Sequence, residues 1–189
     1  TMGKLEQVAN NIVAGGGSAT PIVADTTSEL DVANLFEQAS KIGELSLALY
    51  NAGNNTPGRI DEMSIEYFEE AWRVCCLGGF IFAREALKYM KPRERGAILF
   101  TGASASLRGR ANFGAFNSSK SALRGFAQAL AKECGVNGIH VGHVVIDGAI
   151  NGEKVLTRYP DIAEQLGQER LLQIESIVDA FEYLWKQPK

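Results

Sequence analysis

The sequence has few cysteines, two histidines and no long apolar run. Its three cysteines, Cys75, Cys76 and Cys134, lack the spacing of a disulfide framework or of a zinc site. No run approaches the roughly 18 apolar residues of a membrane-spanning helix, and no basic start leads into the apolar core of a signal peptide. These absences argue against a disulfide-stapled domain and a membrane span, and the free thiols predict a cytoplasmic protein.

An excess of charge of one sign is also missing. The 19 lysines and arginines nearly balance the 22 aspartates and glutamates, which gives a net charge of -3 with no block of like charge. A nucleic-acid-binding surface needs clustered basic residues, so we expect neither a nucleic-acid nor a membrane partner. The 189 residues, of which 46% are hydrophobic, suit a single globular domain over residues 1–189.

Apolar periodicity predicts alternating helices and strands. The predicted helices cover residues 6–14, 30–42, 64–90, 112–134, 160–170 and 176–187, and the predicted strands cover 21–24, 45–50, 97–100 and 139–146. This alternation predicts a doubly wound parallel sheet with helices on both faces. Ligands of such sheets bind beyond the carboxyl ends of the strands, here at Asp25 and at residues 51–53, 101–106 and 147–151.

A glycine-rich phosphate loop between a strand and a helix is absent from the sequence. Residues 15–17 are three glycines that follow a predicted helix, so they are interpreted as a helix end. Thr101-Gly102 does lie between a strand and a helix. However, Ser106 and Arg108 stand where a TGxxxGxG loop requires glycine.

The ends of the strands carry an ordered set of short motifs. Asn51-Ala52-Gly53 follows one strand, residues 101–104 follow the next, Phe116-x-x-x-Lys120 opens the long helix after it, and Asp147-Gly148 follows the last strand. In this order and spacing the set resembles the short-chain dehydrogenase/reductase family. The resemblance implies a Rossmann-like sheet that is incomplete at both ends, because the family's first two strands would precede residue 5 and its last strand would follow residue 189. We therefore expect the chain to be a portion of a longer protein.

The resemblance also implies a reaction and its cofactor. Family members transfer hydride between NAD or NADP and a carbonyl or alcohol substrate. It implies no metal, a catalytic role for Lys120 and Ser104, and Phe116 in the position of the family's tyrosine. The positions implied to bind the cofactor are Asp25, Asn51, Ala52, Gly53, Lys120, Gly148 and Ile150.

Three of the family's four catalytic positions differ in this sequence. Phe116 replaces the tyrosine that exchanges the proton, Ala103 takes the serine position with Ser104 beside it, and Cys76 is assigned to the asparagine position. Only Lys120 is retained. Phenylalanine cannot supply a general acid, so we expect activity to be impaired unless Ser104, Tyr159 or a water held by Lys120 donates the proton. The alternative is an inactive nucleotide-binding or oligomeric scaffold.

Other polar residues receive structural interpretations. His140 and His143 are an odd number of residues apart on a predicted strand, so they face opposite sides and cannot share a metal ion. Ser104 and Ser106 lack a visible His/Asp pattern, which argues against a hydrolase. In the family, the helices that match residues 64–90 and 112–134 pack against a second copy, which implies a homodimer or homotetramer.

Overall fold

The computed structural model describes residues 1–53, 55–158, 164, 167 and 170–187. Within this part of the chain, three parallel strands form one sheet in the order β1 (Leu47–Tyr50), β2 (Gly96–Ala103) and β3 (Ile139–Ile146). Tyr50 pairs with Phe100, and Ala103 pairs with Ile146. All three carboxyl ends therefore lie at the same edge, and the predicted parallel α/β sheet is confirmed.

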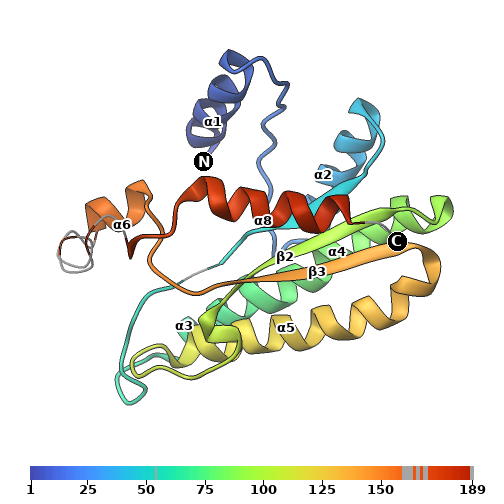
Figure 1. The fold of residues 1–189 in the computed structure, drawn as a ribbon. Coiled ribbons are helices and arrows are strands. Elements are labelled where there is room, and N and C mark those ends of the chain that lie inside the picture. The colour runs from blue at the N-terminus through green and yellow to red at the C-terminus, as the bar shows by residue number, and fades with distance from the viewer. Residues whose placement is uncertain (54, 159–163, 165–166, 168–169, 188–189) are drawn as a thin grey trace.

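Helices cover both faces of this sheet (Figure 1). The face that carries Ile98 and Phe100 packs against α2 (Glu29–Ile42), α4 (Gly78–Met90) and α5 (Gly114–Cys134). The opposite face packs against α8 (Ile174–Lys186), whose Leu184 reaches the backbone of Gly142. The remaining helices are α1 (Met2–Ala14), α3 (Ile65–Trp72) and α6 (Glu153–Arg158).

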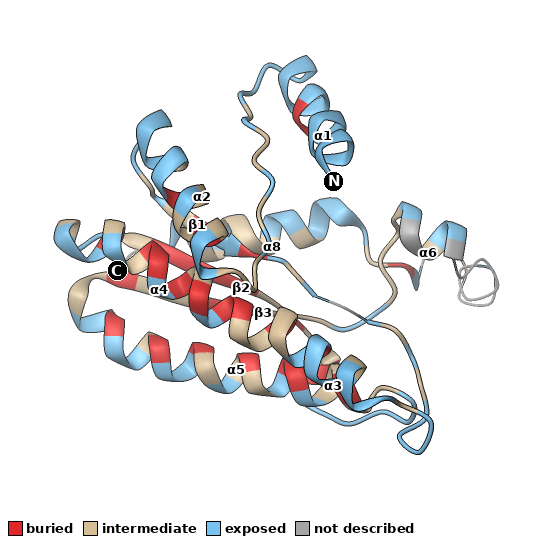
Figure 2. Ribbon diagram, turned by 180° about the vertical axis from the view of Figure 1, so that it is seen from behind, coloured by how far each residue is buried: buried red, intermediate tan, exposed pale blue. Residues whose placement is uncertain are grey.

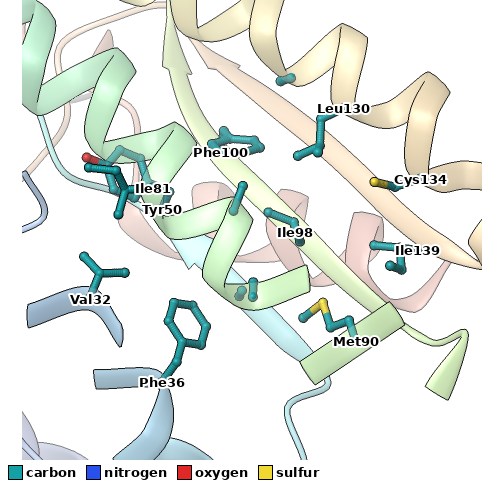
Figure 3. Packing of buried hydrophobic residues seen from close by; sticks show 14 of the residues in the cluster. Val32, Phe36, Tyr50, Ile81, Met90, Ile98, Phe100, Leu130, Cys134 and Ile139 are labelled. Carbon is teal, nitrogen blue, oxygen red and sulfur yellow. The ribbon is translucent and has the colours of Figure 1, made fainter. Parts of the chain in front are cut away.

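The core lies between the sheet and the α2, α4 and α5 layer, where Figure 2 shows the buried residues to be concentrated. Figure 3 shows Phe100 at its centre, with Tyr50 on the neighbouring strand. The ring centroid of Phe100 lies 6.3 Å from that of Tyr50 and 5.9 Å from that of Phe126, both with edge-to-face geometry. Such contacts add to the burial of the rings and fix their orientation.

The main departure from the predicted elements is the strand at residues 21–24. The structure has no strand there, because no described strand lies beside it to complete a hydrogen-bonded ladder. The predicted helix at 64–90 is divided into α3, a π-helical turn over Arg73–Leu77 and α4. Helix α6 was not expected, and most of the helix predicted at 160–170 lies outside the described residues.

The glycines at residues 15–17 end α1, as the sequence predicts. Gly16 has a φ of 85°, a left-handed conformation that favours glycine. The amide of Gly17 donates to the carbonyl of Ile12, which satisfies one of the last carbonyls of the helix. These glycines therefore serve the backbone rather than a phosphate group.

No helix in the described ranges is both long and apolar enough to cross a bilayer.

Candidate functional site

Three loops follow the three strands and meet at one edge of the sheet. Asn51–Gly53 follows β1, a 3-10 turn over Ser104–Ser106 follows β2, and Asp147-Gly148 follows β3. An ion pair joins two of these loops, because Nη2 of Arg108 lies 2.8 Å from Oδ2 of Asp147. This edge is where parallel α/β sheets place their ligands.

Lys120 is the charged group at the centre of this edge. It projects from the second turn of α5 and is only 5% exposed. Its Nζ donates a hydrogen bond of 2.8 Å to the carbonyl of Thr101 at the end of β2, and lies 5.9 Å from the ring centroid of Phe116. Burial lowers the pKa of Lys120, and the nearby Cys75 partly offsets this effect. A desolvated cation is thus held against the strand ends.

Gly53 brings the loop after β1 into the same place. A Cβ atom at this position would lie 3.4 Å from Nζ of Lys120 and 3.6 Å from Sγ of Cys75. Both distances are ordinary van der Waals contacts, so the loop backbone lies directly beside the ammonium group. The structure brings Gly53 and Lys120 together, as the motif spacing implies.

Cys75, rather than Cys76, is the cysteine beside Lys120. The side chain of Cys75 is fully buried against Gly53, whereas Cys76 is half-buried. Burial raises the pKa of the Cys76 thiol, which keeps it protonated near neutral pH. Sequence spacing assigns Cys76 to the family's asparagine position; the neighbouring Cys75, in the π-helical turn over Arg73–Leu77, is the cysteine that lies near Gly53 and Lys120.

The hydroxyl of Tyr50 stabilises that π-helical turn. In this turn the amide of Gly78 donates to the carbonyl of Arg73, which leaves the carbonyl of Val74 without its usual helical donor. The hydroxyl of Tyr50 donates to that carbonyl instead. Burial raises the pKa of Tyr50 to about 12, so the donor proton is retained. Sequence reasoning missed this role because a tyrosine at a strand end resembles any core aromatic residue.

Asp25 lies in the turn before α2, next to this contact. Its Oδ1 accepts hydrogen bonds of 2.8 Å from the backbone amide and the hydroxyl of Thr27. The hydrogen bond from the amide is the main reason that the pKa of the carboxyl lies below its usual range. The following residue, Thr26, hydrogen-bonds the Tyr50 hydroxyl. Tyr50 thus connects the Asp25 turn to the end of β1, and the exposed carboxylate stays ionised.

Phe116 and Ala103, which the sequence comparison by motif leads us to expect at the family's tyrosine and serine positions, carry no ionisable group. Phe116 is half-buried and has no ionisable group, and Ala103 ends β2. Ser104 begins the 3-10 turn, where its carbonyl accepts from the amides of Leu107 and Arg108. Tyr159 lies outside the described residues.

The segment after β3 pairs with the segment around Leu172. Ile150 forms a parallel bridge with Leu172, and a Cβ on Gly148 would lie 3.1 Å from Cδ1 of Leu172. The amide of Leu172 also donates to the carbonyl of Ala149 at 2.8 Å. The structure therefore joins Gly148 and Ile150 to the segment around Leu172.

The two histidines lie on opposite faces of the sheet, as their spacing predicts. His140 lies on the α8 face near Gly142, whereas His143 lies on the α5 face over Gly102. Nε2 of His143 is 3.5 Å from Oγ of Ser106. Sequence reasoning missed this pair, because 37 residues separate its members. In the described ranges, no group of three or more potential metal-binding side chains occurs.

The residues at this edge fit the ribose and nicotinamide end of a dinucleotide. A fixed ammonium group suits ribose hydroxyls, and the carboxylate of Asp25 suits hydroxyl or amino donors. The loop backbone at Gly53 lies beside Nζ of Lys120, and the half-buried ring of Phe116 gives an apolar surface. A phosphate-binding loop is not found among the described residues, so the fit concerns this part of the cofactor.

Comparisons with known proteins agree with this geometry. The family model described as short chain dehydrogenase matches residues 1–154. An uncharacterized oxidoreductase, YuxG, of Bacillus subtilis is 33% identical over 77% of this chain and 21% of its own length. Versicolorin reductase stcU of Emericella nidulans is 32% identical over 80% of this chain and 57% of its own length. The chain thus spans between about a fifth and three fifths of these curated relatives.

Solved structures show the same fold. A short-chain dehydrogenase from Rhodopseudomonas palustris superposes with a TM-score of 0.81 at 29% identity, covering 100% of this chain and 77% of that one. A short-chain type dehydrogenase/reductase from Mycobacterium marinum superposes with a TM-score of 0.87 at 24% identity, over 97% of this chain and 75% of that one. With its fold, its strand-end motifs and the matching family model, this chain belongs to the short-chain dehydrogenase/reductase family.

Proposed function

We propose that the protein is an oxidoreductase that transfers hydride between NAD or NADP and a carbonyl or alcohol substrate, with activity that Phe116 impairs. The observation that carries the proposal is the placement of Lys120, whose buried ammonium is fixed to the Thr101 carbonyl beside Gly53. The family contributes the reaction type. When bound, the cofactor supplies or accepts the hydride.

Different residues at the strand ends would bind different parts of the cofactor. Lys120 would donate to ribose hydroxyls, because its ammonium group has three donors and, in the part of the chain that the structure describes, uses one of them on Thr101. Asn51, Ala52 and Gly53 would line the nucleotide cleft. Asp25, exposed and ionised, would accept hydrogen bonds from the nucleoside.

Gly148 and Ile150 would close the far side of the cofactor. Their bridge to the segment around Leu172 supports this role, because it fixes the backbone that follows β3.

Proton transfer to or from the substrate is the step for which this sequence lacks the family's usual residue. Phe116 has no proton to give, and a well-placed general acid contributes about 10²–10⁴-fold to the rate. Ser104 or a water molecule held by Lys120 would supply the proton in its place. Ser104 is supported by its position, one residue beyond the end of β2.

A second function, nucleotide binding without catalysis, is favoured by the same substitutions. Phe116 and Ala103 remove both hydroxyl groups that the family uses on the substrate, while Lys120 keeps its place. A protein of this kind would serve as a nucleotide-binding or oligomeric scaffold. It would bind the cofactor without transferring hydride.

We also propose that the protein assembles in the cytoplasm as a homodimer or homotetramer. Apolar side chains are exposed along α3 and α4, where Phe68, Trp72 and Phe80 are each at least 40% exposed. The ring of Phe80 packs on that of Phe126 in α5, so the two helices present one joint apolar surface. Light scattering at micromolar concentration should give a mass at least twice that of the chain, and a monomer mass would refute the proposal.

Deuterium transfer distinguishes the two functions. The protein is incubated with nicotinamide-deuterated NADH or NADPH and a panel of aldehydes and ketones, and the products are analysed by mass spectrometry. An oxidoreductase gives deuterium-labelled alcohol, and the label is lost in Lys120→Met but kept in Lys132→Met, an exposed lysine on the same helix. Nucleotide binding without any label in the product supports the scaffold.

A further inference from the structure

A second polar contact lies beneath the loop that follows β2. The imidazole of His143, on β3, faces the 3-10 turn that carries Ser106, and its Nε2 lies 3.5 Å from the serine Oγ. The same Oγ accepts a hydrogen bond of 3.3 Å from the amide of Ala103. His143 therefore connects through Ser106 to the backbone at the family's serine position.

Gly102 allows this arrangement. A Cβ at residue 102 would lie 2.1 Å from Cε1 of His143 and 2.5 Å from its Nε2. The ring thus packs directly on the backbone of β2, where another side chain would collide with it. The imidazole of His143 and the backbone of Gly102 are therefore closely packed between neighbouring strands.

Side chains of helix α5 also form hydrogen bonds to this 3-10 turn. Two side chains of α5 donate to the carbonyl of Ala105 in this turn, the amide of Asn117 at 3.4 Å and the hydroxyl of Ser121 at 3.2 Å. The Asn117 amide also donates at 2.7 Å to the carbonyl of Arg108, which lies just after the turn. The turn is therefore bonded to α5 through Ala105 and faces β3 through Ser106. This is more support than an exposed connecting loop usually has.

The protonation state of His143 fits an accepting role. Burial, together with the charges of Lys120 and Arg124, lowers the pKa of His143 to about 4. The ring is then neutral at pH 7, and one of its nitrogens is free to accept. Because the Ala103 amide already donates to Ser106 Oγ, the serine hydroxyl can donate its proton to Nε2 of the ring. Ser106 is nearly fully buried, and its Oγ already bonds the Ala103 amide and faces His143, so we assign it no role as a nucleophile.

We propose that Ser106 and His143 are a positioning pair: together they fix the turn at residues 103–106 relative to Lys120, so that Ala103 and Ser104 face the bound nicotinamide and substrate. The pair acts through the backbone and touches no reacting atom. The consequence for ligand binding rests on the proposed function, whereas the pair itself does not.

The first experiment examines the pair without any ligand. In nitrogen-15 NMR of the whole protein, Nε2 of His143 should give the shift of an unprotonated acceptor and Nδ1 the shift of a protonated donor. A protonated Nε2 in the folded protein at pH 7 would overturn the pair.

The second experiment uses variants with a matched control. His143→Leu and Ser106→Ala should each raise amide exchange at residues 103–106 about tenfold, whereas His143→Gln, which keeps an acceptor near Nε2, should restore much of the protection. His140→Leu is the control, because His140 lies on the same strand but on the opposite face, and its buried Nε2 has no hydrogen-bond partner among the described residues. Equal exchange in His143→Leu and His140→Leu would refute the proposal.

The third readout separates this proposal from the proposed function. If the protein binds NADH or NADPH, His143→Leu should weaken that binding severalfold while His140→Leu leaves it unchanged. Unchanged nucleotide affinity in His143→Leu would overturn the positioning role. If no nucleotide binds while the NMR and exchange results hold, the proposed function fails and the pair stands.

Discussion

The ammonium group of Lys120 donates to the backbone carbonyl of Thr101 at 2.8 Å, which joins helix α5 to the carboxyl end of the central strand. This bond fixes the cation where the loops after β1 and β2 meet. It also explains why so long a side chain is almost entirely buried. A buried ammonium group that has only one partner in the described structure has hydrogen-bonding capacity left for a ligand.

Replacing Phe116 with tyrosine should increase carbonyl reduction. The ring of Phe116 lies 5.9 Å from Nζ of Lys120, so a tyrosine there would place its hydroxyl near a cation that favours the phenolate. Restoring a general acid should raise kcat by about 10²–10⁴-fold with NADH or NADPH and a reactive ketone. Phe113→Tyr, just before the same helix, is the control and should have no such effect. A Phe116→Tyr variant that binds nucleotide but is no faster would show that the substrate does not approach this ring.

Replacing Tyr50 with phenylalanine should destabilise the fold. The substitution removes the hydroxyl that donates to Val74 in the π-helical turn, and leaves that carbonyl without a donor. We expect the free energy of unfolding to fall by about 1–3 kcal/mol in urea denaturation. Tyr183→Phe, on an exposed tyrosine of α8, should change it by less than about 0.5 kcal/mol. Equal effects in the two variants would mean that Tyr50 does not stabilise the turn.

Stability should depend on pH through His143. Its pKa is about 4 in the folded chain and about 6.5 when unfolded, so between these values the unfolded chain binds more protons than the folded chain. Stability therefore decreases as the pH is lowered through this window. Linkage with these two pKa values gives about 1.8 kcal/mol between pH 7 and pH 5, and solvent screening of the half-buried ring reduces the extra loss that we expect, compared with His143→Gln, to about 1 kcal/mol. The comparison uses urea denaturation at both pH values, and parallel curves for the two proteins would contradict the shift.

The parallel sheet and its site edge could be predicted from the sequence, because both depend on local patterns. The apolar runs before Asn51 and Thr101 mark buried strands, and parallel strands place their polar ends together. The strand at residues 21–24 was predicted wrongly, because a strand depends on a neighbour that no local pattern reveals. Sequence patterns predict a helix or strand best where the contacts that stabilise it come from residues nearby in the sequence.

The contacts that organise the site could not be predicted in the same way. Tyr50 and Val74 are 24 residues apart, and Ser106 and His143 are 37 residues apart. No spacing rule connects such pairs, because the fold alone brings them together. The choice between Cys75 and Cys76 depends on the π-helical turn, which shifts the side-chain positions relative to a regular helix. In space Gly78 lies against Tyr50 and Gly102 against His143, but neither glycine adjoins its partner in the sequence, so the sequence carries no signal of these contacts.

The most direct test of the central claim is a titration of the protein with NADH and NADPH. Energy transfer from Trp72 and Trp185 to the reduced nicotinamide reports binding. A nucleotide site at the strand ends predicts saturable binding in the micromolar range, at least tenfold weaker in Lys120→Met and unchanged in Lys132→Met. Absence of saturable binding to the folded protein, or equal binding to the two lysine variants, would contradict the assignment of this edge as the cofactor site.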